Sequence, residues 1–147
     1  MARIEWQDTA EDIIMKMSDM NPGAISVLVN ILQKTERIDP DNAMGGLGVI
    51  MMLDNNGIYG DDIFVLYCDI CNSDTAKMIA VLRAVQLGFF SGNTLRDAAS
   101  RQDRSGRKMV PVDELCSKVK EELPDFCLTA SMEPAPGAAD QPQQPAP

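Results

Sequence analysis

The stretch that most strongly decides the fold runs from Asn72 to Gly88 and reads NSDTAKMIAVLRAVQLG. Its first three residues are short and polar, and such side chains can accept the free backbone N–H groups at the start of a helix. Its large apolar residues then recur three and four positions apart, which is the period of one helix face. They are Met78, Ile79, Leu82 and Val85. Since glycine often follows a helix end, the sequence predicts a helix from Thr75 to Leu87.

Similar patterns predict further helices on both sides of this segment. The first expected helix begins after Thr9, the second runs from Asn21-Pro22-Gly23 to Lys34–Arg37, and the third runs from the cap Asp39-Pro40-Asp41-Asn42 to Leu53. The fourth begins at Gly60-Asp61-Asp62. Beyond the central helix, one helix runs from Ser91 through Ala99, and the last begins at Val110-Pro111 and ends at Pro124. A short strand at Ile63–Tyr67 competes with the fourth of these helices. The fold class predicted is mainly α, a compact bundle of about six or seven short helices.

The chain of 147 residues fits a single domain. We expect one helical domain over residues 1–127 and a disordered tail over residues 128–147. The tail is rich in proline, alanine and glutamine and has almost no large apolar residue, so it cannot offset the entropy of ordering. No apolar run approaches the roughly 20 residues of a spanning helix, and no secretory signal opens the sequence. We therefore expect a soluble cytoplasmic protein.

The composition excludes several classes of chemistry. The chain has no histidine, which removes the commonest general base and the commonest metal ligand. Cys68 and Cys71 have C-x-x-C spacing, but Cys116 and Cys127 are too far apart to complete a structural zinc site. The turn Asp54-Asn55-Asn56-Gly57 lacks the ligand spacing of a calcium EF-hand loop. Glycines 45, 46 and 48 lack a Walker loop's terminal Gly-Lys-Ser/Thr, and close helix packing is their expected use. We predict no cofactor, no metal site and no catalytic residue.

Charge is strongly segregated along the chain. Residues 1–75 contain four basic and thirteen acidic residues, a net charge of −9, whereas residues 76–110 have a net charge of +5. The acidic total argues against non-specific nucleic-acid binding. The basic block can meet an anionic ligand through arginine forks, or it can be a solvated loop that faces this protein's own carboxylates. The ligand-binding candidates are Arg83, Arg96, Arg101, Arg104, Arg107 and Lys108.

Methionine and aromatic residues raise a second possibility, an adaptable protein-binding surface or an oligomer interface. Filling of an irregular core is the alternative use and the one we expect for most of them. The methionines considered are Met15, Met17, Met20, Met51, Met52 and Met78, and the aromatic anchors are Trp6, Phe89 and Phe90.

Three segments, NPGA (residues 21–24), LDNNGIYG (residues 53–60) and KMIAVLRAVQLG (residues 77–88), give the chain a likeness to known proteins. Much of Ile4 to Phe126 resembles uncharacterised small accessory proteins of tailed bacteriophages. That resemblance implies a phage gene product acting in a bacterial cytoplasm, and it brings no catalytic residues.

The leading functional hypothesis is a non-enzymatic accessory protein that binds a host or phage protein, can also form a homo-oligomer, and makes no membrane contact. The acidic first half would complement a basic surface on that partner. The alternative is sequestration of an anionic nucleotide signal of bacterial immunity, an anti-defence activity that would use the arginines. A weaker alternative is a metal-dependent phosphoesterase using Asp61 and Asp62, although adjacent helical positions point about 100° apart.

Overall fold

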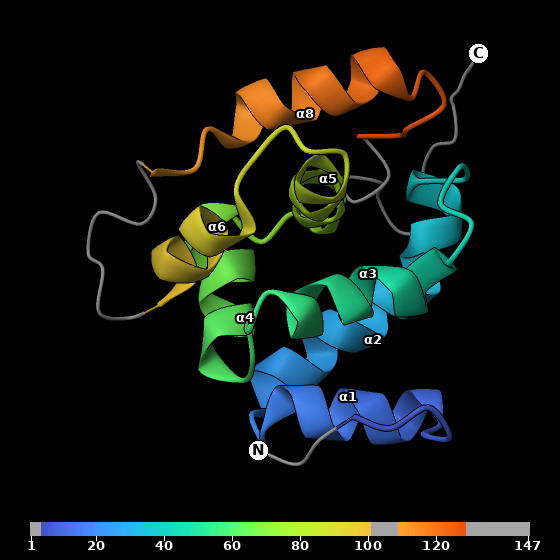
Figure 1. Cartoon of the computed structure of the whole chain (residues 1–147), viewed down its shortest axis with the longest axis vertical. Helices are drawn as coiled ribbons and strands as arrows, with labels where there is room; N and C mark the ends of the chain where they lie inside the picture. Colours follow the sequence, from blue (N-terminus) through green and yellow to red (C-terminus); the bar gives the residue numbers. More distant parts are fainter. Residues whose placement is uncertain (1–3, 101–108, 129–147) are drawn as a thin grey trace, which may run out of the picture.

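The computed structural model describes residues 4–100 and 109–128. Within these ranges the chain forms helices and no strand (Figure 1). The elements are α1 (Ala10–Ser18), α2 (Pro22–Ile38), α3 (Gly45–Asn55), α4 (Asp61–Val65), the π-helical segment η1 (Leu66–Ile70), α5 (Thr75–Gln86), α6 (Gly92–Ala99) and α8 (Val112–Glu122). The prediction of a mainly α-helical bundle is confirmed, and the competing strand at Ile63–Tyr67 is wrong. Of the tail predicted over residues 128–147, Leu128 is described and packs half-buried against the core, and residues 129–147 lie outside the described residues.

Helix α5 lies at the centre of the bundle and is covered on several sides. It packs against α8, α2, α3 and η1, and Figure 1 shows it almost end-on between α8 above and the pair α2 and α3 below. Eight of its twelve residues are buried. The unbroken buried run Met78–Leu82 is 0% exposed. The stretch that the sequence singles out as most helical therefore forms the middle of the core.

Local capping explains where several helices begin. Thr9 and Asp12 form a reciprocal capping box at the start of α1, and Asn21 accepts hydrogen bonds from two backbone N–H groups of α2. Asp74 accepts from Lys77 N at 3.2 Å at the start of α5, and Ser91 does the same for α6. Each cap satisfies backbone donors that have no partner inside the helix.

The predicted start of α3 is wrong by several residues. Asp39 does not cap a helix there but ends α2, and its backbone N–H donates to Thr35 O at 2.7 Å. The side chain of Asp39 is buried and paired with Arg83 instead of lying at a helix start. The helical path opens only at Gly45, whose φ of +64° favours glycine. Gly46 then allows a close approach to α2, because a Cβ there would lie 2.7 Å from Leu32 Cα.

After α8 the chain folds back onto the end of α2. Phe126 is 0% exposed, and Cys127 N donates to Ile38 O at 2.7 Å. Lys120 Nζ donates to the carbonyl oxygens of Pro124 and Phe126, each at 2.7 Å. This return joins the C-terminal end of α2 to α8 and closes the core from the side opposite α1.

Candidate functional site

Two of the predicted arginine ligands lie in the described part of the chain, and they have different surroundings. Arg83 lies on α5 with its side chain 12% exposed, and its Nε is 2.7 Å from Asp39 Oδ2. Arg96 lies on α6 with its side chain half exposed, 3.7 Å from Asp97 Oδ1. Arg83 is therefore engaged in an internal ion pair. The other candidates, Arg101, Arg104, Arg107 and Lys108, lie outside the described residues, so the arginine site stays a prediction.

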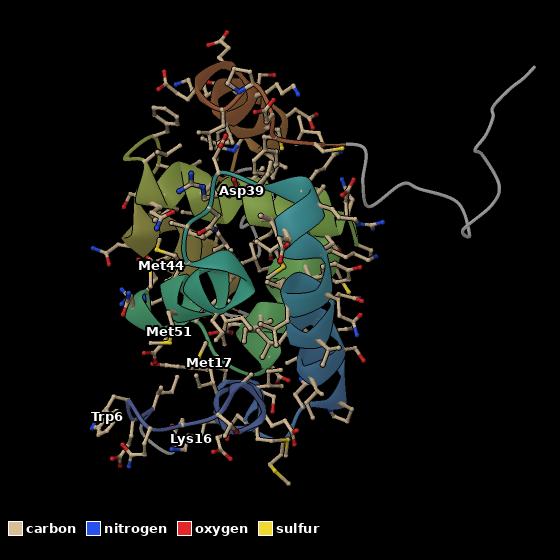
Figure 2. All side chains as sticks on the ribbon, turned by 90° about the vertical axis from the view of Figure 1, so that its right-hand side faces the viewer. Trp6, Lys16, Met17, Asp39, Met44 and Met51 are labelled. Carbon is tan, nitrogen blue, oxygen red and sulfur yellow. The ribbon has the colours of Figure 1, made fainter. Side chains whose placement is uncertain are left out.

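The Asp39–Arg83 pair is a structural link between the end of α2 and the centre of the bundle. The Asp39 side chain is 0% exposed, and Figure 2 shows it where the chain leaves α2 toward α3. Burial raises the pKa of the Asp39 carboxyl above its ordinary value, while the nearby Arg83 charge acts in the opposite direction. Arg83 also donates through Nη1 to Gln86 Oε1. The charge of Arg83 is therefore already engaged in contacts that stabilise the fold.

The other candidate groups form no reactive centre in the described residues. Cys71 is fully buried, and burial raises its thiol pKa; burial also raises the pKa of Cys116 to about 11. Thiols that resist ionisation are poor nucleophiles and poor metal ligands. Asp61 accepts a hydrogen bond from the Asn21 side chain. No group of three or more potential metal-ligating side chains occurs within residues 4–100 and 109–128.

The most unusual feature of the described surface is the outer side of α3. This helix, GGLGVIMMLDN, contains no charged residue before Asp54. Its inner positions, including Ile50 and Leu53, are buried against α2 and α5. A helix that is apolar on all sides is normally covered on all sides. Here the outer side is open, with Met44 65% and Leu47 39% exposed and Met51 half-buried.

Two of these residues lie within the helix and the third lies at its start. Leu47 and Met51 are four positions apart in α3, which places their side chains on the same face, and Met44 is the residue directly before the first residue of α3. Figure 2 shows Met44 and Met51 on the same side of the molecule, the side on which α3 lies in front of α2 in Figure 1. Among residues 4–100 and 109–128, these side chains therefore form one exposed apolar face and not a set of scattered surface residues.

Trp6 lies on that same side of the molecule (Figure 2) and is 95% exposed. It belongs to a hydrogen-bonded turn in which Glu5 N donates to Asp8 Oδ2 at 2.8 Å and Asp8 N donates to Glu5 O at 3.0 Å. Lys16 of α1 ties the turn down through a 2.7 Å ion pair with Asp8. These contacts with Lys16 and Glu5 lower the pKa of the Asp8 carboxyl. The backbone around Trp6 is held while its ring projects into solvent.

We call Trp6, Met44, Leu47 and Met51 the methionine–tryptophan surface. Sequence reasoning found it only in part, because it considered Trp6 as an anchor and Met51 as a surface methionine but expected most methionines in the core. The structure divides that group: Met17 and Met78 are 0% exposed, whereas Met15 and Met20 are 47% and 76% exposed. Phe89 and Phe90 pack against the core as half-buried residues. The missed signal was the absence of any charge on the outer positions of α3.

In the part of the chain that the structure describes, no helix combines the length and the apolar character needed to cross a bilayer. No protein-family model, curated protein or solved structure matches this sequence.

Proposed function

We propose that this protein acts by binding another protein through the methionine–tryptophan surface. The observation that carries the proposal is the exposed apolar side of α3, a helix that bears no charge before Asp54, together with Met44 directly before the helix, which is 65% exposed. Contiguous exposed apolar side chains on a folded domain are characteristic of interaction sites. Tryptophan and methionine are enriched in the cores of protein interfaces. The resemblance to small phage proteins suggests a partner from the phage or its bacterial host.

Protein binding is better supported than anion sequestration by the described residues. Of the two candidate arginines they contain, Arg83 is largely covered and already paired with Asp39. A ligand phosphate would have to displace the buried Asp39 carboxylate from Arg83. The apolar surface, in contrast, needs no rearrangement to become available.

Site-specific photocrosslinking tests the proposal. A photoreactive phenylalanine derivative replaces Leu47 in the full chain, and cells of the bacterium that expresses the protein are irradiated. The matched control carries the same derivative at Met20, which is more exposed but lies at the other end of α1 from the Trp6 turn. We expect a crosslinked protein from Leu47 and none from Met20.

The mass of the product distinguishes the occupants. A product of twice the 16.1 kDa of the chain would indicate a second copy, and any other mass a different protein. The Met44→Gln/Met51→Gln variant, with the derivative still at Leu47, should lose the product. Equal labelling from Leu47 and Met20, or no labelling from Leu47, would overturn the proposal.

A further inference from the structure

The methionine–tryptophan surface is bordered by carboxylates. Asp54 follows Met51 by three residues and so lies on the same side of α3, where it is half-buried and accepts a hydrogen bond from the Tyr59 hydroxyl at 2.7 Å. The exposed Asp41 comes three residues before Met44. The exposed Glu5 directly precedes Trp6. Together, residues 4–18 and 40–55 contain six acidic residues and one basic residue. The apolar centre therefore has an acidic border.

The one basic residue in these segments does not change the sign of that border. Lys16 Nζ lies 2.7 Å from Asp8 Oδ2, so its charge is already balanced. A second copy of the chain would bring the same carboxylates against one another, which opposes association through this surface. An anionic lipid surface would be repelled for the same reason, since helices that lie on membranes carry lysine and arginine beside their apolar face.

From this charge pattern we infer that the partner docks a short basic amphipathic helix onto the methionine–tryptophan surface. The inference rests on the proposed function and adds the chemistry of the partner. The part of α3 from Gly45 to Asp54 corresponds to about 14 Å of helix, enough for an apolar stripe of two to three turns. Lysine or arginine residues at both ends of that stripe meet Asp41 and Asp54. Methionine side chains adapt to varied apolar shapes, as in other grooves that receive amphipathic helices.

A display library of helix-forming peptides with randomised surface positions tests the inference against the full-length protein. Binders that also bind the Met44→Gln/Met51→Gln variant are removed, so that the survivors depend on the methionine–tryptophan surface. Glutamine keeps the size of methionine without adding charge, which avoids a spurious gain in binding of basic peptides. We expect survivors with apolar residues at positions i, i+3, i+4 and i+7 and a net positive charge.

The outcomes separate the two proposals. Survivors that are acidic, neutral or of alternating strand-like pattern would overturn the inferred partner chemistry but leave protein binding at this surface intact. No survivors, together with no crosslink from Leu47, would overturn both. Self-association of the free protein that the double glutamine variant abolishes would assign the surface to a second copy and overturn the inference.

One selected peptide then gives a quantitative check. Its Kd should rise at least about tenfold for Met44→Gln/Met51→Gln, as expected when central apolar anchors are lost. It should be unchanged for the control Met20→Gln. Replacing the flanking lysines of the peptide by glutamate should weaken binding further, and added salt should weaken binding of the lysine peptide because exposed charges are screened. A Kd that is insensitive to both salt and the lysine replacement would contradict the role of the acidic border. Circular dichroism confirms that each variant is folded.

Discussion

Helices α3 and α5 are both apolar on nearly every side, yet they have opposite positions in the molecule. Helix α5 is enclosed by α2, α3, α8 and η1, and its residues from Met78 to Leu82 are fully buried. Helix α3 packs on α2 and α5 but leaves Leu47, and Met44 directly before the helix, exposed. Similar apolar sequences thus serve a core in one case and an exposed face in the other.

This difference shows which apolar residues stabilise the fold and which are available for binding. Shortening a buried side chain of α5 removes packing contacts on all sides, whereas shortening an exposed side chain on the open face of α3 removes few contacts. If the methionine–tryptophan surface is a binding site, its residues should be nearly neutral for stability and important for association. The following experiments test that contrast, beginning with the largest expected effect.

The strongest effect is expected from breaking the ion pair that joins α5 to the end of α2. Arg83→Met leaves the Asp39 carboxylate buried without a charge partner, which should lower the free energy of unfolding by about 3–5 kcal/mol at neutral pH. Urea unfolding followed by circular dichroism measures the change. Asp39→Asn/Arg83→Met removes both charges and should recover more than half of the loss. A double variant as unstable as Arg83→Met would contradict the charge explanation.

The same pair has a defined pH dependence. Burial raises the pKa of Asp39 above its usual 3.8, so the folded state binds this proton more tightly than the unfolded state. Asp39 therefore contributes most to stability below pH 3.8, and that contribution decreases as the pH rises through the folded pKa. Because Arg83 opposes the rise in pKa, the destabilisation by Arg83→Met should grow with pH above about 4.

A matched pair of methionine truncations compares the two helices directly. Met78→Ala in α5 should lower the free energy of unfolding by about 2–5 kcal/mol, because its side chain is fully buried. Met44→Ala beside α3 should change it by no more than about 0.5 kcal/mol, because Met44 is 65% exposed. The measurement is again urea unfolding. A large loss for Met44→Ala would mean that this side chain supports the fold and would weaken its assignment to a binding surface.

The sequence predicts the features of this fold that depend on neighbouring residues. The caps at Thr9, Asn21, Asp74 and Ser91 are recognisable because the donor and acceptor are two or three residues apart. The start of α3 is not recognisable from the sequence. Asp39 resembles a helix cap locally, but its side chain is buried against Arg83, which is 44 positions further along the chain. A distant charge thus overrides a local signal.

The candidate site was only partly predictable for a related reason. An apolar stretch such as Leu47–Leu53 predicts burial, and whether another helix covers its outer face depends on the arrangement of the whole bundle. Once the buried side of α1 is known, the helical period alone predicts that Met17 is buried and Met15 is exposed. Trp6 precedes the first helix, so no periodic pattern bears on its exposure. The loop arginines lie outside the described residues and stay a prediction.

A smaller effect is expected where α3 meets α2. Gly46→Ala places a Cβ 2.7 Å from Leu32 Cα, which forces the two helix backbones apart and should lower the free energy of unfolding by about 1–3 kcal/mol. Alanine is otherwise the better helix former, so a stabilised variant would show that the helices lie further apart than described. The same shift should weaken peptide binding, because α3 carries Leu47 and Met51 of the methionine–tryptophan surface and begins directly after Met44. Urea unfolding and peptide titration give the two readouts.

The smallest change is expected in the turn that presents Trp6. Contacts with Lys16 and Glu5 lower the pKa of Asp8, so their stabilising effect is present above pH 3.8 and is lost as the pH falls through the lower folded value. Trp6 is the single tryptophan of the chain, so its fluorescence anisotropy reports on this turn alone. Anisotropy should drop below pH 3.8 in the natural protein and should be low at every pH in Asp8→Asn, while circular dichroism at neutral pH stays unchanged. Glu11→Gln, which neutralises an exposed carboxylate on the same helix, should behave like the natural protein. If Asp8→Asn left the anisotropy at neutral pH unchanged, Trp6 would be held by something other than the Asp8–Lys16 contact, and the ordered presentation of this ring would need another cause.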